Sequence, residues 1–434
     1  MTNGQASAED IAAGTIEATP DTASAPVKRE DRIASLDFIR GLAVMGILAA
    51  NIVAFGQPFG AYLYPGAFLT EHGATSDALY IVQFVLIDGK MRGLFTLLFG
   101  AGLLLFMDRA WARGQTIGLQ ARRLGFLLLF GMIHYFFVWT GDILTYYALV
   151  GFIALAFLRM EPRNLIVLGS IIYAAGAILL GALFFWIYAV ADTPLGDAGP
   201  LADMRAGLVE GQREMAASDA VATELIRSGD YLGWVANQFT AHTFDQFSNV
   251  FMILPETLPL MMFGMAFYRL GMFDGGIARS RQMLWGWIAL IAGALLSFAV
   301  AMWAAGNGLT FWGTMAAHVG LSIVPRLLMV LGLAALLGLY APKASSWLGS
   351  RISAAGRVAF TNYIGTSVLM LFVFHGFGLG LFGELARPEL YLVVVATWIV
   401  MLLWSKPWLE RFRYGPLEWL WRCLTYGRLF PISR

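Results

Sequence analysis

The sequence predicts an all-α protein, a polytopic transmembrane helix bundle of about ten spans (9–11) with both termini in the cytoplasm. First, its 434 residues are 59% hydrophobic and 13% charged, with a mean hydropathy of +0.68, whereas soluble domains carry about 25% charged residues. Second, it contains repeated apolar runs near the roughly 20 residues that a membrane-crossing helix needs. Third, its basic residues alternate from loop to loop. Together these observations exclude a soluble enzyme.

Ten segments are apolar enough to be candidate spans. The second is the least regular, because Asp88, Lys90 and Arg92 interrupt it near its middle. It is therefore either one span or a broken helix whose membrane-crossing part begins near Arg92. The ten predicted spans are 37–56, 79–107, 122–140, 142–159, 164–191, 250–270, 282–305, 310–340, 353–378 and 389–405.

The distribution of basic residues tests this count, because Lys and Arg concentrate in cytoplasmic loops. With ten spans, cytoplasmic termini, and basic residues near the cytoplasmic end of a span counted with the adjoining inside segment, 22 of the 29 Lys and Arg residues are inside, 4 lie in outside loops and 3 lie within spans. The alternation holds at every loop, and losing one span would disrupt it. We therefore expect an N-in and C-in topology.

The chain divides into three regions. Residues 1–34 are rich in Ala, Thr, Ser and Gly without an apolar core, which indicates a disordered cytoplasmic tail and not a signal peptide. Residues 35–405 form the predicted transmembrane bundle. It includes an extracytoplasmic loop at 192–249, which is polar at first and amphipathic from Tyr231, as is typical of an interfacial helix. Residues 406–434 combine Trp and Tyr with basic residues, which predicts a cytoplasmic interfacial helix.

The net charge and the cysteine content limit the kinds of ligand and partner that this protein can have. The formal net charge of +1 gives no reason to expect a nucleic-acid partner. The single cysteine, Cys423, excludes an internal disulfide and a Cys-based zinc cluster, and we expect no metal. Membrane lipids are the partners that the composition does indicate.

Three stretches resemble known membrane protein families. LDFIRGLA at Leu36–Ala43, with Asn51 eleven residues after Arg40, resembles the opening of the transmembrane acyltransferases. GRVAFTNY at 356–363 and GPLEWLWR at 415–422 resemble the C-terminal half of the YeiB-like family of bacterial inner-membrane proteins. That family is grouped with heparan-α-glucosaminide N-acetyltransferase. The resemblance extends over about residues 35–430, nearly the whole chain.

This resemblance implies a reaction and a location. It implies a multi-pass protein of the bacterial inner membrane that takes an acyl group from acyl-CoA, with acetyl-CoA as the first candidate co-substrate, at the cytoplasmic side. The acceptor would approach from the membrane or the outer side. Arg40 becomes a candidate contact for the coenzyme phosphates. Asn51 stands where the O-acyltransferases have a catalytic His, and Tyr62 stands where the heparan enzyme has one.

A buried histidine offers a base for this chemistry. His134 lies twelve residues beyond Arg122, about 18 Å into its span, and Asn51 lies about 21 Å into the first. Asp142 follows in a tight hairpin and could fix the imidazole tautomer. We therefore take His134, Asn51 and Asp142 as catalytic candidates, with Asn51 as a donor to the oxyanion. The alternative is structural: His134 bonds a neighbouring helix, and Asp142 caps the next one.

Charged residues inside spans are further candidates, because their burial in lipid costs at least a few kcal/mol (roughly 2.5–3.5 on insertion scales). Lys90, Arg92 and Arg326 could hold an anionic ligand such as the coenzyme phosphates. Alternatively, Lys90 and Arg92 could be neutralised by Asp88 at a helix break. Arg326 could instead be paired with a carboxylate such as Glu256 or Asp88.

Two more histidines have simpler interpretations. His318 could share the surroundings of Arg326 as a hydrogen-bonded core residue, and His375 near the outer end of the ninth span is typical of the interface.

Three functions remain open. The first is a membrane-bound acyltransferase acting on a sugar, a lipid or another envelope acceptor. The second is a small-molecule or lipid transporter or flippase, with Arg326 and Lys90 lining its path. The third is a non-catalytic membrane scaffold or sensor. The identity of the acceptor is open in each case, and a homodimer is compatible with the sequence.

Overall fold

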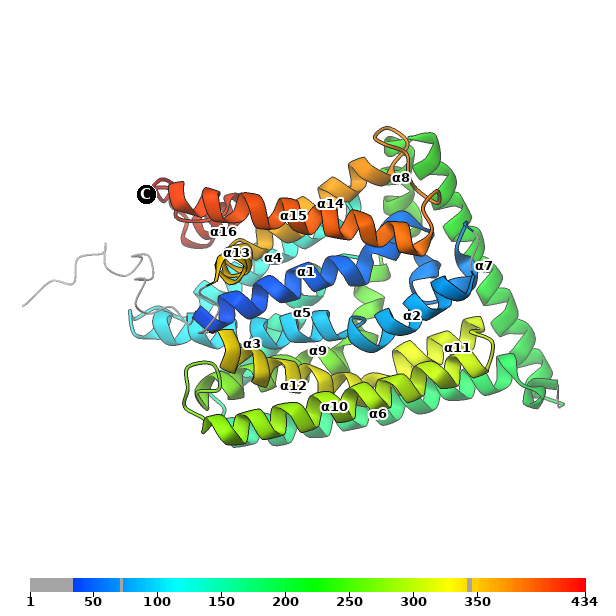
Figure 1. Ribbon diagram of the computed structural model, residues 1–434, viewed down its shortest axis with the longest axis horizontal. Helices are drawn as coiled ribbons and strands as arrows, with labels where there is room; N and C mark the ends of the chain where they lie inside the picture. The colour runs from blue at the N-terminus through cyan, green and yellow to red at the C-terminus, as the bar shows by residue number, and fades with distance from the viewer. Residues whose placement is uncertain (1–33, 71–72, 198, 342–345) are drawn as a thin grey trace, which may run out of the picture.

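The computed structural model describes residues 34–70, 73–197, 199–341 and 346–434 (Figure 1). Almost all regular structure in these residues is helical, and the β-structure recorded there is one isolated bridge between Phe412 and Ser433. The predicted all-α class is therefore confirmed. The predicted cytoplasmic tail falls almost entirely outside the described residues.

The helices follow one another with short connections. They are α1 (Ala34–Gly56), α2 (Ala74–Leu86), α3 (Lys90–Trp111), α4 (Ile117–Phe137), α5 (Leu144–Ala154), α6 (Pro162–Asp192), α7 (Leu201–Ser228), α8 (Tyr231–Ala241), α9 (Asp245–Arg269), α10 (Arg279–Gly306), α11 (Phe311–Met315), α12 (Ile323–Tyr340), α13 (Trp347–Arg357), α14 (Ala359–Phe374), α15 (Arg387–Arg411) and α16 (Pro416–Tyr426). Short 3₁₀ segments occur at Phe59–Tyr62 and Pro65–Ala67, and a π-helix at Ala316–Leu321 leads from α11 towards α12.

The described residues contain seven helical segments long and apolar enough to cross a membrane, one of which, Ala74–Trp111, runs through α2 and α3, and the pair of α13 and α14 is an eighth candidate. Those two helices meet at 86°. The predicted spans 122–140 and 142–159 are also largely helical, as α4 and α5. They fall outside the seven because α4 carries two arginines and a histidine and α5 is short. The ten-span, N-in and C-in topology stays a prediction.

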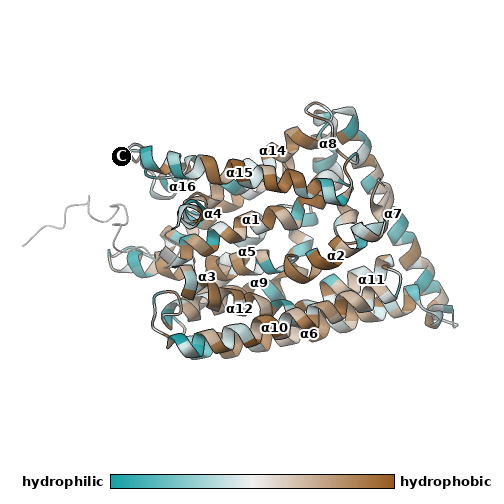
Figure 2. Ribbon diagram, in the orientation of Figure 1, coloured by the Kyte–Doolittle hydropathy of each residue, from teal (hydrophilic) through white to brown (hydrophobic). Residues whose placement is uncertain are grey.

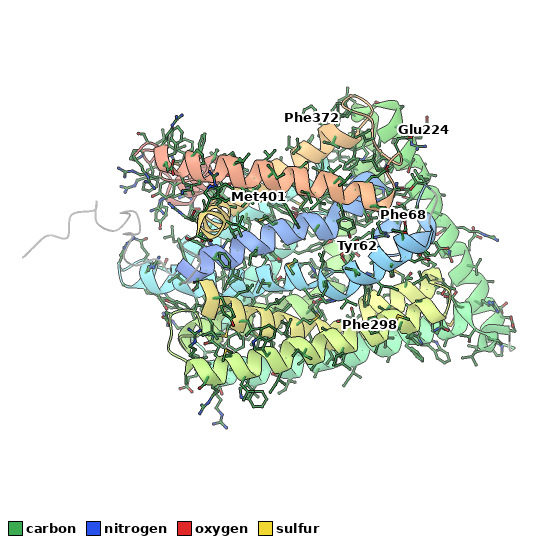
Figure 3. All side chains as sticks on the ribbon, in the orientation of Figure 1. Tyr62, Phe68, Glu224, Phe298, Phe372 and Met401 are labelled. Carbon is green, nitrogen blue, oxygen red and sulfur yellow. The ribbon has the colours of Figure 1, made fainter. Side chains whose placement is uncertain are left out.

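The long helices run roughly side by side along the long axis of the molecule (Figure 1). Their middles are hydrophobic and the hydrophilic residues gather towards the two ends (Figure 2). Large apolar side chains such as Phe298 and Phe372 are about half exposed on the periphery of the bundle (Figure 3). A soluble protein would bury such residues, so this periphery is suited to lipid.

The two ends of the bundle differ. The start of α1 lies at the same end as the C-terminus and α16, whereas α7 lies across the opposite end (Figure 1). Residues 201–228, which the sequence suggested were polar loop, form α7, a helix without a fully buried residue. A helix does begin at Tyr231, as predicted, and is α8. In the C-terminal region, α15 continues to Arg411 before α16 begins.

Three of the apolar segments are interrupted inside the bundle. The sequence left open whether the second span is one span or a broken helix, and in the structure α2 and α3 are separated at residues 87–89, where Gly89 has a φ of 70°. A non-glycine residue is strained in that conformation. α9 contains Pro255 and Pro259, and the π-helix precedes α12. These breaks surround the buried charged residues described below.

Glycines set the closest helix contacts, as is typical of membrane bundles. A Cβ atom on Gly356 of α13 would collide with the carbonyl oxygen of Asp37 in α1. Likewise, a Cβ on Gly264 of α9 would collide with the carbonyl oxygen of Leu97 in α3. The first of these contacts holds α1, which carries the candidate residues Arg40 and Asn51, against α13.

Candidate functional site

His134 and Asp142 form a buried pair where α4 ends and α5 begins. Each residue is 1% exposed, and His134 Nδ1 lies 2.8 Å from Asp142 Oδ1. The second oxygen, Oδ2, accepts the backbone N–H of Thr145 at 2.7 Å. Asp142 therefore does both things that the sequence left open: it holds the imidazole and caps the next helix.

The pair leaves one imidazole nitrogen unused. Because an ionised carboxylate only accepts hydrogen bonds, the bond to Asp142 places the proton on Nδ1 and a lone pair on Nε2 of His134. Nε2 is buried and has no hydrogen-bond partner among the described residues. Buried polar atoms are rarely left unpaired, so this atom calls for an explanation.

Two aromatic rings beside His134 also line a small cavity with Asn51, which His134 itself does not line. The rings of Tyr363 and Trp139 lie with their centroids 5.1 and 6.3 Å from that of His134. The Tyr363 hydroxyl accepts the backbone N–H of Ile143 at 3.2 Å. Both rings also line a cavity of about 10 Å³ together with Asn51, close to the room that one water molecule needs. The two predicted catalytic groups therefore share two aromatic neighbours.

A larger cavity lies around the start of α1, with a volume of about 270 Å³. Arg40 lines it and is paired with Asp37 at 3.0 Å. Of its basic residues, only Arg40 was predicted as a site residue, because the others come from α3, α4, α16 and the connection after α3. In the sequence, these other arginines served only to indicate which loops are cytoplasmic. The arginines of this cavity are Arg40, Arg109, Arg113, Arg123 and Arg422; we call it the arginine cavity.

One face of α1 borders both cavities. Arg40 and Asn51 are eleven residues apart, which corresponds to about 16 Å along the axis and a rotation of only about 20°. Val44 and Ile47 lie between them on this face, and both line the small cavity with Asn51. The helix thus presents a basic end and an amide on the same side.

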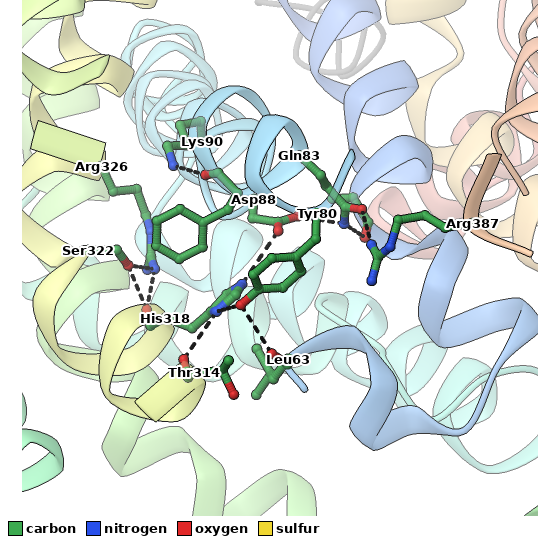
Figure 4. Close-up of polar contacts among 12 residues, drawn as sticks. Leu63, Tyr80, Gln83, Asp88, Lys90, Thr314, His318, Ser322, Arg326 and Arg387 are labelled. Atoms are coloured by element: carbon green, nitrogen blue, oxygen red, sulfur yellow. Dashed lines mark hydrogen bonds and ion pairs between the residues drawn. The ribbon is translucent and has the colours of Figure 1, made fainter. Parts of the chain in front are cut away.

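Arg92 and Arg326, two of the predicted ligand-binding residues, are paired with protein groups elsewhere. Arg326 Nη1 donates to Glu256 at 2.8 Å, and Arg92 Nη2 donates to the same carboxylate oxygen at 2.7 Å. Arg326 Nη2 also donates to the carbonyl of His318 and to the hydroxyl of Ser322 (Figure 4). The internal anion that the sequence required for Arg326 is therefore Glu256.

Lys90 completes this buried cluster. Its ammonium group donates to the carbonyl of Phe84 at 2.5 Å. Asp88 accepts from Gln83 at 2.9 Å and lies 3.5 Å from Nε2 of His318 (Figure 4). Lys90, Arg92 and Arg326 are thus grouped at the helix breaks, and the structure does not bring them together with Arg40. Arg40 opens α1 at one end of the bundle, whereas the other three lie deeper, where broken helices need polar partners.

Arg387 was not predicted as a cluster residue. It is completely buried, donates to Gln83 at 3.0 Å and lies 4.6 Å above the ring of Phe68 and 5.5 Å from that of Tyr80. In the sequence it is one more outside-loop arginine, and no pattern distinguishes it. Gln83 joins it to Asp88 and so extends the cluster towards α15.

Comparisons with known proteins place the chain among relatives. Residues 267–428 match the family described as "Protein of unknown function (DUF418)". The chain is 29% identical to "Uncharacterized protein YxaH" of Bacillus subtilis, over 94% of this chain and 98% of the relative. It is 31% identical to "Uncharacterized protein YeiB" of Escherichia coli, over 92% of this chain and 98% of the relative. No solved structure matches. This multi-pass membrane protein therefore belongs to the YeiB family.

Proposed function

We propose that this protein is a membrane-bound acyltransferase that moves an acetyl or other short acyl group from acyl-CoA to a sugar, lipid or envelope acceptor. The observation that carries the proposal is the buried His134–Asp142 pair with an unpartnered Nε2. An imidazole held by a carboxylate, with its second nitrogen available, is the arrangement of a general base. Acyl transfer from a thioester needs such a base.

The reaction has two steps. The acceptor oxygen or nitrogen attacks the thioester carbonyl carbon while Nε2 of His134 takes the acceptor proton. The new C–O or C–N bond forms, and the carbonyl oxygen becomes an oxyanion, to which the Asn51 amide would donate. The C–S bond then breaks with its electron pair on sulfur, and the imidazolium returns its proton to that sulfur. The products are an ester or amide and the coenzyme thiol.

The arginine cavity supports acyl-CoA as the donor. Its five arginines offer guanidinium groups, which bind phosphates in a bidentate manner. From this cavity, the face of α1 leads about 16 Å to Asn51. Phosphates held by Arg40 and its neighbours would leave the acyl end to extend along that face. The residues therefore fit a long co-substrate with one polyanionic end.

The base is tested by comparing two histidines with similar geometry. His242 Nδ1 lies 2.8 Å from Asp245, as His134 lies from Asp142, but this pair is partly exposed. We expect His134→Ala to lower thiol release from acetyl-CoA about 10²-fold or more, with an envelope extract as acceptor. His242→Ala should keep wild-type turnover. Wild-type turnover in His134→Ala protein would refute the assignment.

The co-substrate site is tested separately by binding. Arg40→Gln should weaken acetyl-CoA binding measured by calorimetry. Arg281→Gln, at the exposed start of α10, should leave binding unchanged. Equal affinities in the two variants would remove the arginine cavity from the proposal.

Transport is the second candidate, because one observation favours it. Breaks in α2–α3, in α9 and before α12 surround the buried charged cluster, and discontinuous helices with polar groups are typical of transporter binding sites. Movement of a labelled solute across proteoliposomes without chemical change, together with normal turnover in His134→Ala protein, would favour this function.

A further inference from the structure

A third cavity lies at the end of the bundle across which α7 runs. Its volume is about 60 Å³, and α1, α7, α8 and α14 all contribute to its wall. Aromatic rings supply much of that wall, from Phe55, Trp139 and Trp234 among others, and its ionisable groups are Asp219 and His375. We call it the outer cavity. Neither the sequence patterns nor the comparisons assign a role to it.

Two residues that line this cavity each carry a buried polar atom without a partner in the described part of the chain. Trp139 Nε1 and His375 Nδ1 belong to residues that are 7% and 6% exposed, and neither atom has a hydrogen-bond partner among the described residues. Gly141 leaves room for the six-membered ring of Trp139, where a Cβ would collide with it. The Trp139 side chain is thus closely packed, and a polar atom on each of the two residues stays unused. Two such atoms on one cavity indicate a polar ligand.

Asp219 sets the charge of that ligand. Its Oδ2 accepts the backbone N–H of Gly60 at 2.8 Å, so the carboxylate is held against the cavity. Burial raises the pKa of Asp219 above its ordinary value. A ligand beside Asp219 would be one that donates hydrogen bonds and carries no negative charge of its own.

The aromatic rings of the outer cavity indicate the shape of its ligand. The stacked rings of Phe55 and Trp139 lie 4.0 Å apart, and Trp234 packs edge-on against His375 at 5.6 Å. The faces of aromatic rings are electron-rich and attract the weakly positive C–H groups of a saturated ring. Flat aromatic surface with a few polar atoms at its edges suits a ring whose faces are C–H groups and whose edges are hydroxyls.

We infer that the outer cavity binds a polyhydroxylated ring compound without a negative charge, that is, a sugar or polyol unit. Phe55 and Trp139 line both this cavity and the small cavity of Asn51, and Trp139 also contacts His134. The outer cavity is therefore the acceptor site for acyl transfer, and this last step rests on the proposed function. Sugar binding itself does not depend on it.

Binding is tested with D-glucose as the neutral probe and D-glucuronate as its anionic counterpart, by equilibrium dialysis against the full-length protein in detergent. We expect glucose to bind more tightly than glucuronate. Trp139→Phe keeps an aromatic ring, although a smaller one, but removes the indole N–H, and should weaken glucose binding about threefold to tenfold, the effect of one lost hydrogen bond. His375→Ala should weaken it similarly. Trp287→Phe, on the exposed surface of α10, is the matched control and should change nothing.

The preference for glucose over glucuronate gives a second test, which does not depend on a variant that binds glucose more weakly. Asp219→Asn removes the repelling charge and should bring the glucuronate affinity close to that of glucose. The inference is overturned if glucose does not bind, if it binds Trp139→Phe and His375→Ala proteins as tightly as the wild type, or if Asp219→Asn leaves the selectivity unchanged.

The two proposals can fail independently. Trp139-dependent glucose binding together with normal turnover in His134→Ala protein would support the sugar site and refute the proposed function. His134-dependent turnover without glucose binding would support the proposed function and refute the acceptor site.

Discussion

Glu418 accepts hydrogen bonds from both the backbone N–H and the hydroxyl of Thr361, at 3.1 and 2.5 Å. It also accepts the N–H of Phe360 at 2.8 Å. A side chain of α16 therefore caps the first turn of α14, where backbone N–H groups lack helical partners. The two C-terminal blocks that resemble the YeiB-like family, 356–363 and 415–422, are thus one structural unit, and this unit positions Tyr363 beside His134.

This cap should be measurable as stability. Glu418→Ala removes every acceptor and should lower the free energy of unfolding by about 1–2 kcal/mol. Glu418→Gln keeps one carbonyl oxygen and should cost less. Thermal unfolding in detergent measures both, with Glu410→Ala on the exposed side of α15 as control. If Glu418→Ala protein is as stable as the wild type, the cap contributes nothing.

The same residue should make stability depend on pH. Burial raises the pKa of Glu418 above its ordinary value, so the folded protein binds this proton more tightly than the unfolded chain. The resulting stabilisation is complete below the ordinary pKa of Glu, about 4.3, and is lost as the pH rises through the raised pKa. Melting temperatures across this range should therefore fall less in Glu418→Gln protein than in the wild type. If the melting temperatures of the two proteins change in parallel with pH, Glu418 is not the group responsible for this pH dependence.

Two glycines in the segment LFGAGLLLF provide a matched pair. A Cβ on Gly100 would collide with the backbone of Met261 in α9, whereas a Cβ on Gly102 would meet nothing within 4 Å. Gly100→Ala should push α3 and α9 apart and lower the melting temperature. Gly102→Ala should be neutral or stabilising, because Ala favours a helix by up to about 1 kcal/mol over Gly. Equal effects of the two substitutions would show that this contact does not constrain the bundle.

The buried cluster depends on one carboxylate shared by two arginines. Glu256→Gln would leave the guanidinium groups of Arg92 and Arg326 buried without their anion, and breaking a buried pair costs about 3–5 kcal/mol. Glu210→Gln removes an exposed partner of Arg213 and should have no measurable effect. Chemical denaturation of both variants makes the comparison. A Glu256→Gln protein as stable as the wild type would mean that water or another anion replaces the carboxylate.

The sequence predicts local relationships better than distant ones. His134 and Asp142 are eight residues apart around one hairpin, so their contact followed from helix geometry. Charge balance identified Glu256 as one candidate partner for Arg326, although seventy residues separate them. Neither helix geometry nor charge balance could predict the arginine cavity. Four separate segments converge there, and helix packing decides which of them meet.

Composition did not reveal the secondary structure of one element. The segment 201–228 is polar and acidic, and these features are typical of a loop, yet they equally suit a helix that lies on the surface. Its structure as α7 depends on contacts with the bundle end, such as the hydrogen bond from Gly60 to Asp219. The sequence contains no local signal for such a contact, and so the outer cavity could not be predicted.

The double role of Asp142 allows catalysis and folding to be separated. Asn is also a good N-cap residue, so Asp142→Asn can still accept the N–H of Thr145 through its carbonyl oxygen. Its amide nitrogen would then face Nδ1 of His134 and donate to it, which moves the imidazole proton to Nε2 and removes the base. Turnover should fall about 10²–10⁴-fold while the melting temperature changes little. Asp142→Ala should lose both turnover and stability, because it removes the cap as well. Thiol release and thermal unfolding, measured on the same preparations, distinguish these outcomes, and an active Asp142→Asn protein would show that His134 does not act as the base.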